Sequence, residues 1–411
     1  MAALKDGKKL TRRNFLKRTT AGIFGSGVLV NAGKYFQVKG GKSPAKDVEM
    51  KYRTLGRSGL KVSEIGMGTW EAPNENVMSY AIDKGINYID TAPEYKEGEE
   101  ERMVGRVVKN RRDKVVIASK FFTTSKSTKQ ETMNFLEATL KRMQTDYLDV
   151  MIIYQVGEIL PRRGITKGIE RLKNENVIEM VNQAKKDGKV RAFGVSSHGG
   201  DLAGYMNYAV DSGNFDMIMI KYNFMTFPEE EKITKKAKEN NVGSVAFKVV
   251  GGAYDQKIKG YENSRTPEFR RAAIKWVLSN PNITTLVIRM PTFDEVDNCL
   301  KSLSEKMGYN DRKILERYAS AVKPYFCRWC GTCTQACPYS VAVPTIQRYL
   351  MYYTNFNHQG TAVQKYANLL PEQRAYKCFE CSAPCEKICP NNIPIKEILT
   401  QAHKTLKSDI T

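Results

Sequence analysis

Residues 115–155 decide the fold: the apolar run VVIASKF is followed by the amphipathic run TMNFLEATLKRMQ and then by the apolar run YLDVMIIYQ. Short apolar runs are typical of buried strands, and apolar residues at helical spacing are typical of a helix that packs on one face. A strand, a helix and a second strand in succession form a unit whose strands lie parallel. The stretch therefore predicts an α/β fold.

The same alternation extends in both directions from this unit. Further amphipathic runs lie at 177–189 and 268–280, with Gly or Asn near their ends, as in helix C-termini. Eight strand–helix units in about 240 residues fit a (β/α)8 TIM barrel. An open doubly wound sheet is also compatible with this order, but no G-x-G-x-x-G follows the first strand, so the eight-fold count favours the barrel. The predicted strands are 62–69, 87–92, 115–121, 147–155, 190–198, 215–223, 242–250 and 283–290.

Eight cysteines near the C-terminus form two runs. The first is Cys327-x-x-Cys330-x-x-Cys333-x-x-x-Cys337, followed by Pro338. Bacterial ferredoxins hold 4Fe–4S clusters with this spacing, in which three cysteines ligate one cube and the fourth reaches the neighbouring cube. The run therefore predicts cluster ligands.

The second run is Cys378-x-x-Cys381-x-x-x-Cys385-x-x-x-Cys389, followed by Pro390, and it repeats the first with one extra residue in the middle gap. Two such runs predict two 4Fe–4S clusters that exchange their fourth ligands. One cluster would be held by Cys327, Cys330, Cys333 and Cys389, and the other by Cys378, Cys381, Cys385 and Cys337.

Zinc sites and disulfides are the alternative uses of these cysteines. Zinc sites pair Cys-x-x-Cys or include His and need no trailing proline, and disulfides impose no such spacing. The ninth cysteine, Cys299, lies in a helical pattern, where we expect a buried apolar side chain. The predicted C-terminal domain that holds these cysteines (306–411), called the tail below, is thus expected to carry electrons.

The N-terminus resembles a twin-arginine export signal. TRRNFLK (11–17) matches that pattern, a basic start precedes it, and a weakly apolar stretch (21–30) follows. This stretch is too short for a spanning helix, which needs about 20 apolar residues. Val30-Asn31-Ala32 loosely resembles a cleavage site. The alternative is a basic disordered arm.

The two ends of the chain support each other. Clusters are assembled in the reducing cytoplasm, and free thiols threaded into an oxidising compartment would be oxidised. The twin-arginine export machinery carries folded proteins with their cofactors in place. The resemblance therefore predicts a periplasmic protein, which would remain tethered to the inner membrane if the signal is not cut.

Length, composition and charge set the domain layout and the class of partner. The 411 residues, 41% of them hydrophobic, allow one large domain and one small one. The formal net charge is +21. In an exported protein nucleic acid is a poor partner, so an anionic membrane surface or an acidic redox partner explains a basic face better, unless that face has no specific role. We predict a signal peptide at 1–33, a linker at 34–50, a barrel at 51–305 and a dicluster 4Fe–4S domain at 306–411.

The predicted barrel resembles the aldo-keto reductase family. YRTLGRSGLKVSEIGMGTW (52–70) is similar to the family's opening segment, and INYIDTAPEY (86–95) to the segment that carries its catalytic Asp and Tyr. VVIASKF, DYLDVMIIY, GKVRAFGVSSH and KYNF follow in the family's order and spacing. The resemblance covers 51–305, and the tail resembles the small dicluster extension of some members.

The resemblance implies a catalytic group at the C-terminal mouth of the barrel, made of Asp90, Tyr95 and Lys120. Hydride transfer to a carbonyl leaves an alkoxide, and Tyr95 would give it a proton. We expect Lys120 to lower the pKa of Tyr95 from its usual value near 10, and Asp90 to keep Lys120 charged. Tyr154 stands where the family has a His. It would donate the hydrogen bond to the substrate carbonyl instead, although its bulk would fill part of the substrate's place.

The resemblance also implies an NADP(H) site at this mouth, with departures from the family pattern. Ser197 stands where an Asn is common and Met219 where a Gln is common, and those amides normally bind the nicotinamide. Phe247 would stack under the nicotinamide, and Arg289 would approach a phosphate. His198 is expected to be structural. The expected cofactor contacts are Gly68, Thr69, Ser196, Ser197, Tyr222, Phe247, Lys248 and Arg289.

Two functions are compatible with these patterns. The first is an exported aldo-keto reductase-type oxidoreductase that acts on a small carbonyl or alcohol and exchanges electrons with a redox partner through its clusters. The second is an electron-transfer or binding protein whose barrel no longer uses a nicotinamide cofactor, which the departures at Tyr154, Ser197 and Met219 favour. Clusters move single electrons whereas a hydride carries two, and no flavin fingerprint bridges them.

Overall fold

A computed structural model describes residues 49–71, 74–157, 168–197, 199, 201–226, 228–251, 266–356 and 358–407. The predicted signal peptide at 1–33, the linker up to residue 48, and His198 lie outside the described residues. Residues 48–411 form one compact unit.

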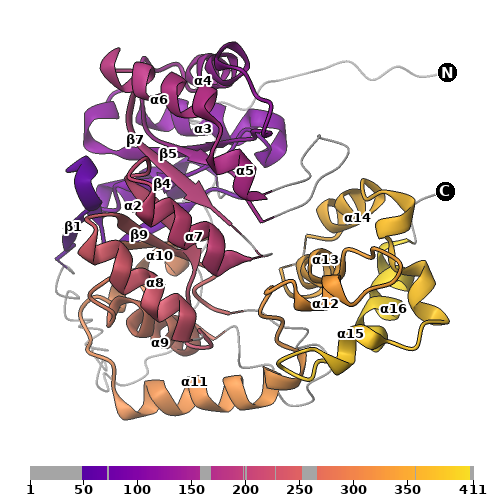
Figure 1. The fold of residues 1–411 in the computed structure, drawn as a ribbon. Helices are drawn as coiled ribbons and strands as arrows, with labels where there is room; N and C mark the ends of the chain where they lie inside the picture. Colours follow the sequence, from indigo (N-terminus) through magenta and orange to yellow (C-terminus); the bar gives the residue numbers. More distant parts are fainter. Residues whose placement is uncertain are drawn as a thin grey trace, which may run out of the picture. The chain divides into compact units, whose positions relative to one another are not determined.

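Eight parallel strands close into a barrel, as the sequence predicts (Figure 1). Each strand pairs with the next in chain order, and the last strand closes the barrel by pairing with the first. The strands are β3 (Ile65–Gly68), β4 (Tyr88–Asp90), β5 (Val116–Phe121), β6 (Leu148–Ile153), β7 (Val190–Ser196), β8 (Met217–Lys221), β9 (Gly243–Phe247) and β10 (Thr285–Ile288).

Amphipathic helices follow the strands and cover the barrel. Thr128 starts the helix of the 115–155 unit with a capping box, in which its hydroxyl accepts from the Glu131 amide and the Glu131 carboxylate accepts from the Thr128 amide. Such a cap stabilises a helix by about 1 kcal/mol. The helices are α2 (Glu75–Asp83), α3 (Glu99–Val108), α4 (Lys129–Met143), α5 (Gly168–Leu172), α6 (Glu175–Lys186), α7 (Leu202–Asp211), α8 (Pro228–Glu239), α9 (Pro267–Leu278) and α10 (Phe293–Lys301).

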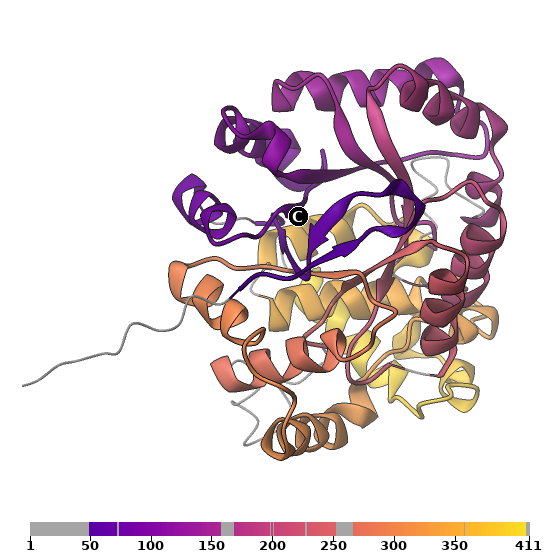
Figure 2. The same ribbon diagram turned by 90° about the vertical axis from the view of Figure 1, so that its left-hand side faces the viewer.

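A short antiparallel hairpin, β1 (Tyr52–Thr54) and β2 (Lys61–Ser63), precedes the barrel and crosses in front of its strands in Figure 2. Leu55, Leu60 and Val62 from the hairpin are buried in one cluster with inward-facing barrel side chains. The hairpin thus closes the N-terminal end of the barrel. Any site is left to the C-terminal end, where barrel enzymes place it.

Helix α11 (Tyr309–Val322) packs against α9 and belongs to the barrel. Its Leu315, Tyr318 and Val322 are buried in the barrel's main hydrophobic core. The predicted boundary at 305/306 lies before this helix, so the packing of the barrel continues beyond that boundary.

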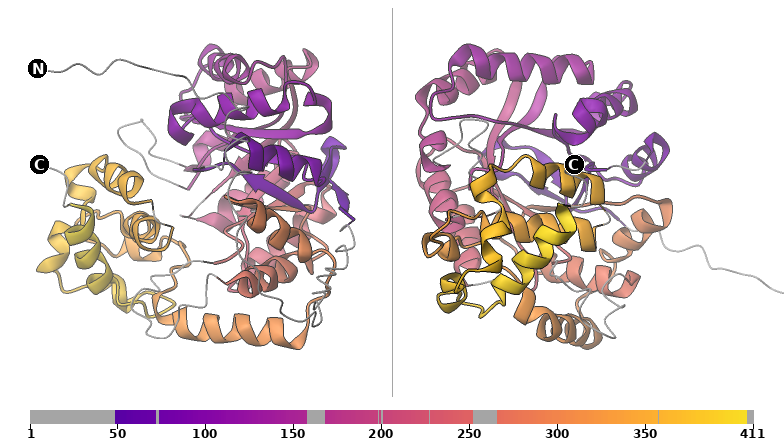
Figure 3. Two further views of the ribbon diagram at one scale, coloured as in Figure 1. Left: turned by 180° about the vertical axis from the view of Figure 1, so that it is seen from behind. Right: turned by 90° about the vertical axis from the view of Figure 1, so that its right-hand side faces the viewer.

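The C-terminal region is helical and has its own hydrophobic core (Figure 3). It consists of α12 (Thr332–Gln335), α13 (Val343–Asn355), α14 (Gln359–Ala367), α15 (Pro384–Lys387) and α16 (Ile395–Leu406). The short helices α12 and α15 each lie within one cysteine run and contact one another, which places the two runs side by side. Among the described residues, no helix has the length and apolar character to cross a membrane.

Candidate functional site

A buried ion pair lies at the C-terminal end of the barrel. Asp90 is the last residue of β4, and Lys120 lies near the end of the neighbouring strand β5. The Lys120 Nζ donates to Asp90 Oδ1 at 2.6 Å and to the Thr91 carbonyl at 2.8 Å, and both charged side chains are almost fully buried. Burial raises the pKa of Asp90, and the Lys120 charge opposes this shift. Asp90 therefore holds the Lys120 ammonium in place by accepting its hydrogen bond.

Tyr95 lies beside this pair. It starts the 3-10 turn η2 (Tyr95–Gly98), and the Lys120 Nζ is 5.0 Å from the centre of its ring. The Tyr95 hydroxyl is hydrogen-bonded to that of Tyr154, whose ring centre is 5.6 Å from the same Nζ. Tyr95, Lys120, Asp90 and Tyr154 thus form one contiguous group.

The pKa of Tyr95 differs from the sequence expectation. Burial foremost, and then the neighbouring Tyr154 and Asp90, raise the pKa of Tyr95 well above its ordinary value of 10.0. The expected lowering by Lys120 was wrong. Desolvation penalises a phenolate more than a nearby ammonium stabilises it when that ammonium is already paired with Asp90.

The backbone that follows β6 is held by a buried arginine. Arg171 on α5 is 1% exposed and donates to the carbonyls of Tyr154 at 2.7 Å and Gln155 at 2.9 Å. Gln155 has a left-handed backbone (φ +53°), which a residue other than glycine rarely adopts without support. Arg171 therefore fixes the turn that presents Tyr154.

A cavity of about 1110 Å³ opens at this end of the barrel. It exceeds the roughly 300–1,000 Å³ of ordinary small-molecule pockets. Its walls come from both parts of the chain. The barrel side includes Gly68, Asp90, Tyr95, Lys120, Tyr154, Ser196, Met219, Phe247 and Arg289, and the tail side includes Tyr352, Asn355, Phe356, His358 and Thr361.

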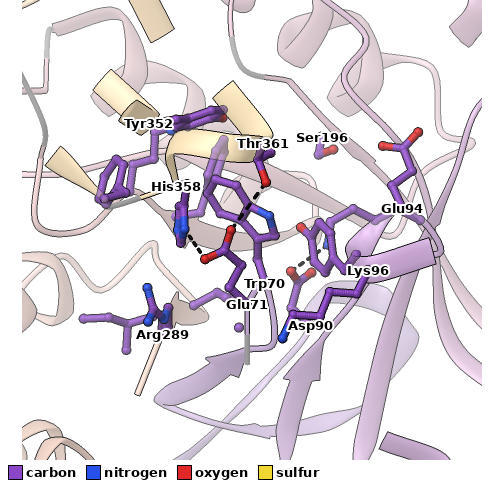
Figure 4. Close-up of a pocket in the computed structure, with 18 of the residues that line it drawn as sticks. Trp70, Glu71, Asp90, Glu94, Lys96, Ser196, Arg289, Tyr352, His358 and Thr361 are labelled. Atoms are coloured by element: carbon purple, nitrogen blue, oxygen red, sulfur yellow. Dashed lines mark hydrogen bonds and ion pairs between the residues drawn. The ribbon is translucent and has the colours of Figure 1, made fainter. Parts of the chain in front are cut away.

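Trp70 and Glu71, which follow β3, connect the two walls (Figure 4). The Trp70 ring centre lies 4.9 Å from that of Tyr352, 4.4 Å from that of His358 and 6.4 Å from that of Tyr95. Glu71 pairs with the His358 ring and accepts a long hydrogen bond of 3.5 Å from Thr361. The helical tail thus contacts the barrel directly at the cavity.

The contact between His358 and Glu71 involves a neutral imidazole. Burial, followed by the charge of Arg289, lowers the pKa of His358 to about 4. Burial raises the pKa of Glu71, against the charges of Arg289 and Lys96. At neutral pH the imidazole is therefore uncharged, and its contact with Glu71 is not an ion pair.

The cofactor contacts implied by the resemblance divide into two groups. Gly68, Ser196, Phe247 and Arg289 line the cavity, and Thr69 is fully buried directly after Gly68.

Two further implied contacts, Ser197 and Tyr222, do not line the cavity, and their role in holding a cofactor stays a prediction. The Ser197 hydroxyl is held by the Gly199 carbonyl and the Gly157 amide. The Tyr222 hydroxyl donates to Glu231 at 2.6 Å and accepts from Asn280, outside the barrel mouth.

Lys248 lines the cavity but is held by the tail. Its Nζ lies 5.1 Å from the ring centre of Trp329, 5.2 Å from that of Tyr352 and 5.9 Å from that of Phe356. Such contacts with aromatic faces favour a cation. The lysine is therefore bound by the aromatic residues of the tail.

The cysteines of the two runs lie close to one another. Burial, and then neighbouring thiols that include Cys330 and Cys389, raise the pKa of Cys327 to about 12. Burial, and then neighbouring thiols with Cys337 first among them, raise the pKa of Cys378 to about 12. Cysteines of each run thus lie beside cysteines of the other, and Cys333 has both Cys385 and Cys389 among its neighbours. Buried thiols of this kind ionise at neutral pH only beside a cation.

The backbone of both runs is shaped in the same way around the sulfurs. The Trp329 amide donates to the Cys327 sulfur at 3.3 Å, and the Ala383 amide donates to the Cys381 sulfur at 3.4 Å. Trp329 and Ala383 both have left-handed backbones. Amide hydrogen bonds to ligand sulfurs are a feature of iron–sulfur sites.

No three cysteine, histidine or acidic side chains of the described chain converge on a single ion. Cys299 is fully buried at the barrel, apart from both groups, as predicted.

Sequence reasoning missed the residues that join the two walls: Trp70, Glu71, His358 and Thr361. One signal was available for Trp70 and Glu71, because they follow the first strand at its C-terminal end, where barrel sites lie. The sequence holds no comparable signal for His358, whose role depends on how the tail docks.

Comparisons with known proteins agree with this geometry. Residues 64–319 match the model of the Aldo/keto reductase family, and residues 326–393 match that of the 4Fe-4S dicluster domain. A curated relative, the aldo-keto reductase YhdN of Bacillus subtilis (strain 168), is 26% identical over 225 residues. The match covers 48% of this chain and 61% of the relative.

Solved structures share the fold of the barrel. The holo form of an aldo-keto reductase from Bacillus halodurans superposes with a TM-score of 0.52 at 22% identity, covering 68% of this chain and 99% of that one. An aldo-keto reductase from Klebsiella pneumoniae, solved in complex with NADPH, has a TM-score of 0.50 at 20% identity, covering 65% and 95%. The chain belongs to the aldo/keto reductase family and carries a 4Fe-4S dicluster domain at its C-terminus.

Proposed function

We propose that this chain is an exported oxidoreductase that interconverts a small carbonyl and its alcohol in the cavity between the barrel and the tail. The observation that carries the proposal is the buried Asp90–Lys120 pair beside the hydrogen-bonded hydroxyls of Tyr95 and Tyr154. A carbonyl oxygen that replaced the hydrogen bond between these hydroxyls would accept from both of them, in an environment where hydrogen bonds are strong.

Tyr95 acts as the general acid. As negative charge develops on the substrate oxygen, the Tyr95 hydroxyl transfers its proton to that oxygen. Tyr154 donates a hydrogen bond in place of the family's histidine, and Lys120, oriented by Asp90, stabilises the resulting tyrosinate.

The residues present fit a nicotinamide cofactor in part. Arg289 lines the cavity, and its Nε is buried without an acceptor among the described residues, as expected of a group that meets a ligand anion. Phe247 offers a ring in the cavity wall. NADP(H) would supply the hydride, and Gly68, Thr69, Ser196, Phe247 and Arg289 would hold it. The structural relative from Klebsiella pneumoniae was solved with NADPH bound, which supports this choice of cofactor.

Two 4Fe–4S clusters complete the proposal. Cys327, Cys330, Cys333 and Cys389 would hold the first, and Cys378, Cys381, Cys385 and Cys337 the second. The clusters would store single electrons and exchange them with a redox partner. Because the chain carries a formal net charge of +21, an acidic protein is the expected partner. Direct packing of the tail on the barrel supports communication between the two halves.

The second candidate is an electron-transfer or binding protein that does not use a nicotinamide. It is favoured by Met219, which presents a thioether to the cavity where an amide would grip the cofactor, and by Tyr222 and Ser197, whose hydroxyls are engaged elsewhere. Lys248 is likewise engaged by the aromatic side chains of the tail.

One titration separates the candidates. Anaerobically purified, cluster-loaded protein is titrated with NADPH and NADH while nucleotide fluorescence and cluster absorbance are followed together. We expect tight binding with slow bleaching of the cluster absorbance. Binding without bleaching indicates a reductase with a separate cluster domain, and no binding supports the second candidate.

Export is tested separately. The pattern TRRNFLK at 11–17 supports twin-arginine export to the periplasm, and the basic chain supports contact with an anionic membrane surface. Replacing both arginines (Arg12→Lys with Arg13→Lys) should retain the protein in the cytoplasmic fraction. An unchanged distribution between fractions would reject this part of the proposal.

A further inference from the structure

A lysine from the barrel reaches the first cysteine run. Lys221 is the last residue of β8 and is 2% exposed. Its Nζ donates to the carbonyl of Arg328, the residue after Cys327, at 3.2 Å. The same Nζ lies 5.0 Å from the ring centre of Trp329 and 5.5 Å from that of Phe326. The ammonium group is therefore enclosed by the loop that carries the first ligand.

This part of the loop packs closely on the barrel. A Cβ at Gly199, just after β7, would lie 3.0 Å from the Trp329 Cβ, so the space between them is filled. Lys221 brings its amino group to the residue directly after the first predicted cluster ligand. Glu230 on α8, also buried, lies 3.7 Å from the Lys221 Nζ.

The second cysteine run has a lysine in an equivalent place, but from the tail itself. Lys396 on α16 donates from its Nζ to the Cys381 carbonyl at 2.7 Å. The carbonyl that it binds belongs to a predicted ligand of the second cluster. Both ligand loops therefore bind an ammonium group through a backbone carbonyl, and only the first receives it from the barrel.

We propose that Lys221 and Lys396 would each raise the reduction potential of the cluster held by the ligand loop that they bind. The barrel would then tune the first cluster (Cys327, Cys330, Cys333 and Cys389) and not the second. One-electron reduction adds a negative charge to a cluster and its thiolates, and a buried cation nearby stabilises the reduced form. The negative charge of Glu230, beside Lys221, favours the oxidised form and so lowers the potential. The inference rests on the proposed binding of two clusters, and not on the proposed carbonyl chemistry.

The test is a dye-mediated potentiometric titration of the anaerobically reconstituted full chain. Dithionite supplies the electrons, and the electron paramagnetic resonance signals of the reduced clusters are followed. Lys221→Met should shift one midpoint potential to a more negative value and leave the other in place. Lys396→Met should shift only the other midpoint. Glu230→Gln should move the midpoint that responds to Lys221 in the opposite direction, to a more positive value.

Glu230→Gln also protects the test against misfolding, because it keeps the lysine and removes only a charge, whereas Lys221→Met leaves a buried carboxylate unpaired. Iron and sulfide content identifies correctly loaded variants. Equal shifts of both midpoints, or no shift in loaded Lys221→Met and Glu230→Gln proteins, would overturn the inference while leaving two clusters in place. Iron and sulfide for only one cluster in the unmodified chain would overturn both the inference and the two-cluster proposal.

Discussion

Tyr95 combines two environments that act on its hydroxyl in opposite ways. Burial raises its pKa, while the nearby Lys120 ammonium favours the anion that remains after proton transfer. A phenol of this kind stays protonated through the neutral range and releases its proton only to a strongly basic oxygen. An alkoxide formed by hydride transfer is such an oxygen. The site is therefore suited to reduction of a carbonyl rather than to general base chemistry at neutral pH.

Replacing this hydroxyl tests the assignment. Tyr95→Phe should lower kcat for carbonyl reduction by about 10²–10⁴-fold, the usual contribution of a positioned acid. The fold should persist with a loss of about 1 kcal/mol, because one hydrogen bond to Tyr154 disappears. Steady-state kinetics and thermal unfolding measure the two effects. Tyr309→Phe, at a residue 76% exposed and outside the cavity, is the matched control. Turnover at the unmodified rate in Tyr95→Phe would reject Tyr95 as the acid.

The raised pKa also predicts a pH profile. In the proposed reaction the protonated form of Tyr95 gives a proton to the substrate oxygen as hydride arrives, and this form is lost only as pH rises through the pKa of the residue. Because burial places that pKa well above 10.0, kcat for reduction should not fall from Tyr95 ionisation between about pH 7 and 10. A profile of kcat against pH measures this. A decline with a midpoint near pH 8 that Tyr95→Phe abolishes would restore the lowered pKa expected from the sequence.

The sequence predicts the positions of single residues better than the directions of their side chains. Asp90, Tyr95 and Lys120 were placed together because strand ends and spacing determine their positions. Tyr222 and Ser197 follow strands in the same way, yet their hydroxyls turn toward Glu231 and toward the Gly199 carbonyl. The direction of a side chain just after a strand depends on the turn that follows, which spacing alone does not specify.

At the scale of elements, the short helix α5 supports the end of a strand. Arg171 on α5 satisfies two backbone carbonyls that β6 leaves after Ile153. The buried guanidinium stabilises the fold as long as it stays hydrogen-bonded to these carbonyls. Each buried polar group left without a partner lowers the free energy of unfolding by about 1–3 kcal/mol. The turn that carries Tyr154 therefore depends on α5.

Arg171→Met should lower the free energy of unfolding by about 2–5 kcal/mol, since two buried carbonyls lose their donors. It should also lower kcat, because Tyr154 loses its support. Denaturant unfolding and steady-state kinetics measure these effects. Lys173→Met, at an exposed neighbour on the chain, should change stability by no more than about 0.5 kcal/mol. Equal stability of Arg171→Met and the unmodified protein would mean that water replaces the guanidinium.

The sequence predicted the elements better than their partners. The eight strands were found because each is a short apolar run buried on both faces. The helix at Tyr309–Val322 was assigned to the tail, but its apolar face packs on α9. An amphipathic pattern predicts that a helix buries one face, and it does not identify the surface that covers that face.

At the scale of the whole molecule, the tail forms one wall of the barrel's cavity. Trp70 and Glu71 meet the tail on one side of the cavity, and Lys248 meets it through Trp329, Tyr352 and Phe356. A ligand in the cavity would therefore contact both parts of the chain. Spacing in the sequence predicted the two parts and their ligands but not this shared wall, because docking depends on surfaces that only the folded parts possess.

The predicted exchange of fourth ligands concerns both cysteine runs at once. Cys389 lies in the second run but is predicted to bind the cluster of Cys327, and Cys337 lies in the first run but is predicted to bind the cluster of Cys378. The proximity of Cys389 to Cys327 and of Cys337 to Cys378 supports this assignment. Cys389→Ala should therefore abolish the same electron paramagnetic resonance signal as Cys327→Ala, and Cys337→Ala the same signal as Cys378→Ala. Iron content should fall by about half in each variant, because a cube that loses a thiolate is no longer held.

Cys299→Ala is the matched control for this series. Its thiol is fully buried at the barrel and belongs to neither group, so both signals and the full iron content should remain. If Cys337→Ala instead removed the signal that Cys327→Ala removes, each run would hold its own cluster, and the fourth ligands would not be exchanged. Such an exchange would matter for folding as well as for redox chemistry, because each crossed thiolate would tie one run to the cluster of the other. It would join α12 and α15 through metal in addition to their packing.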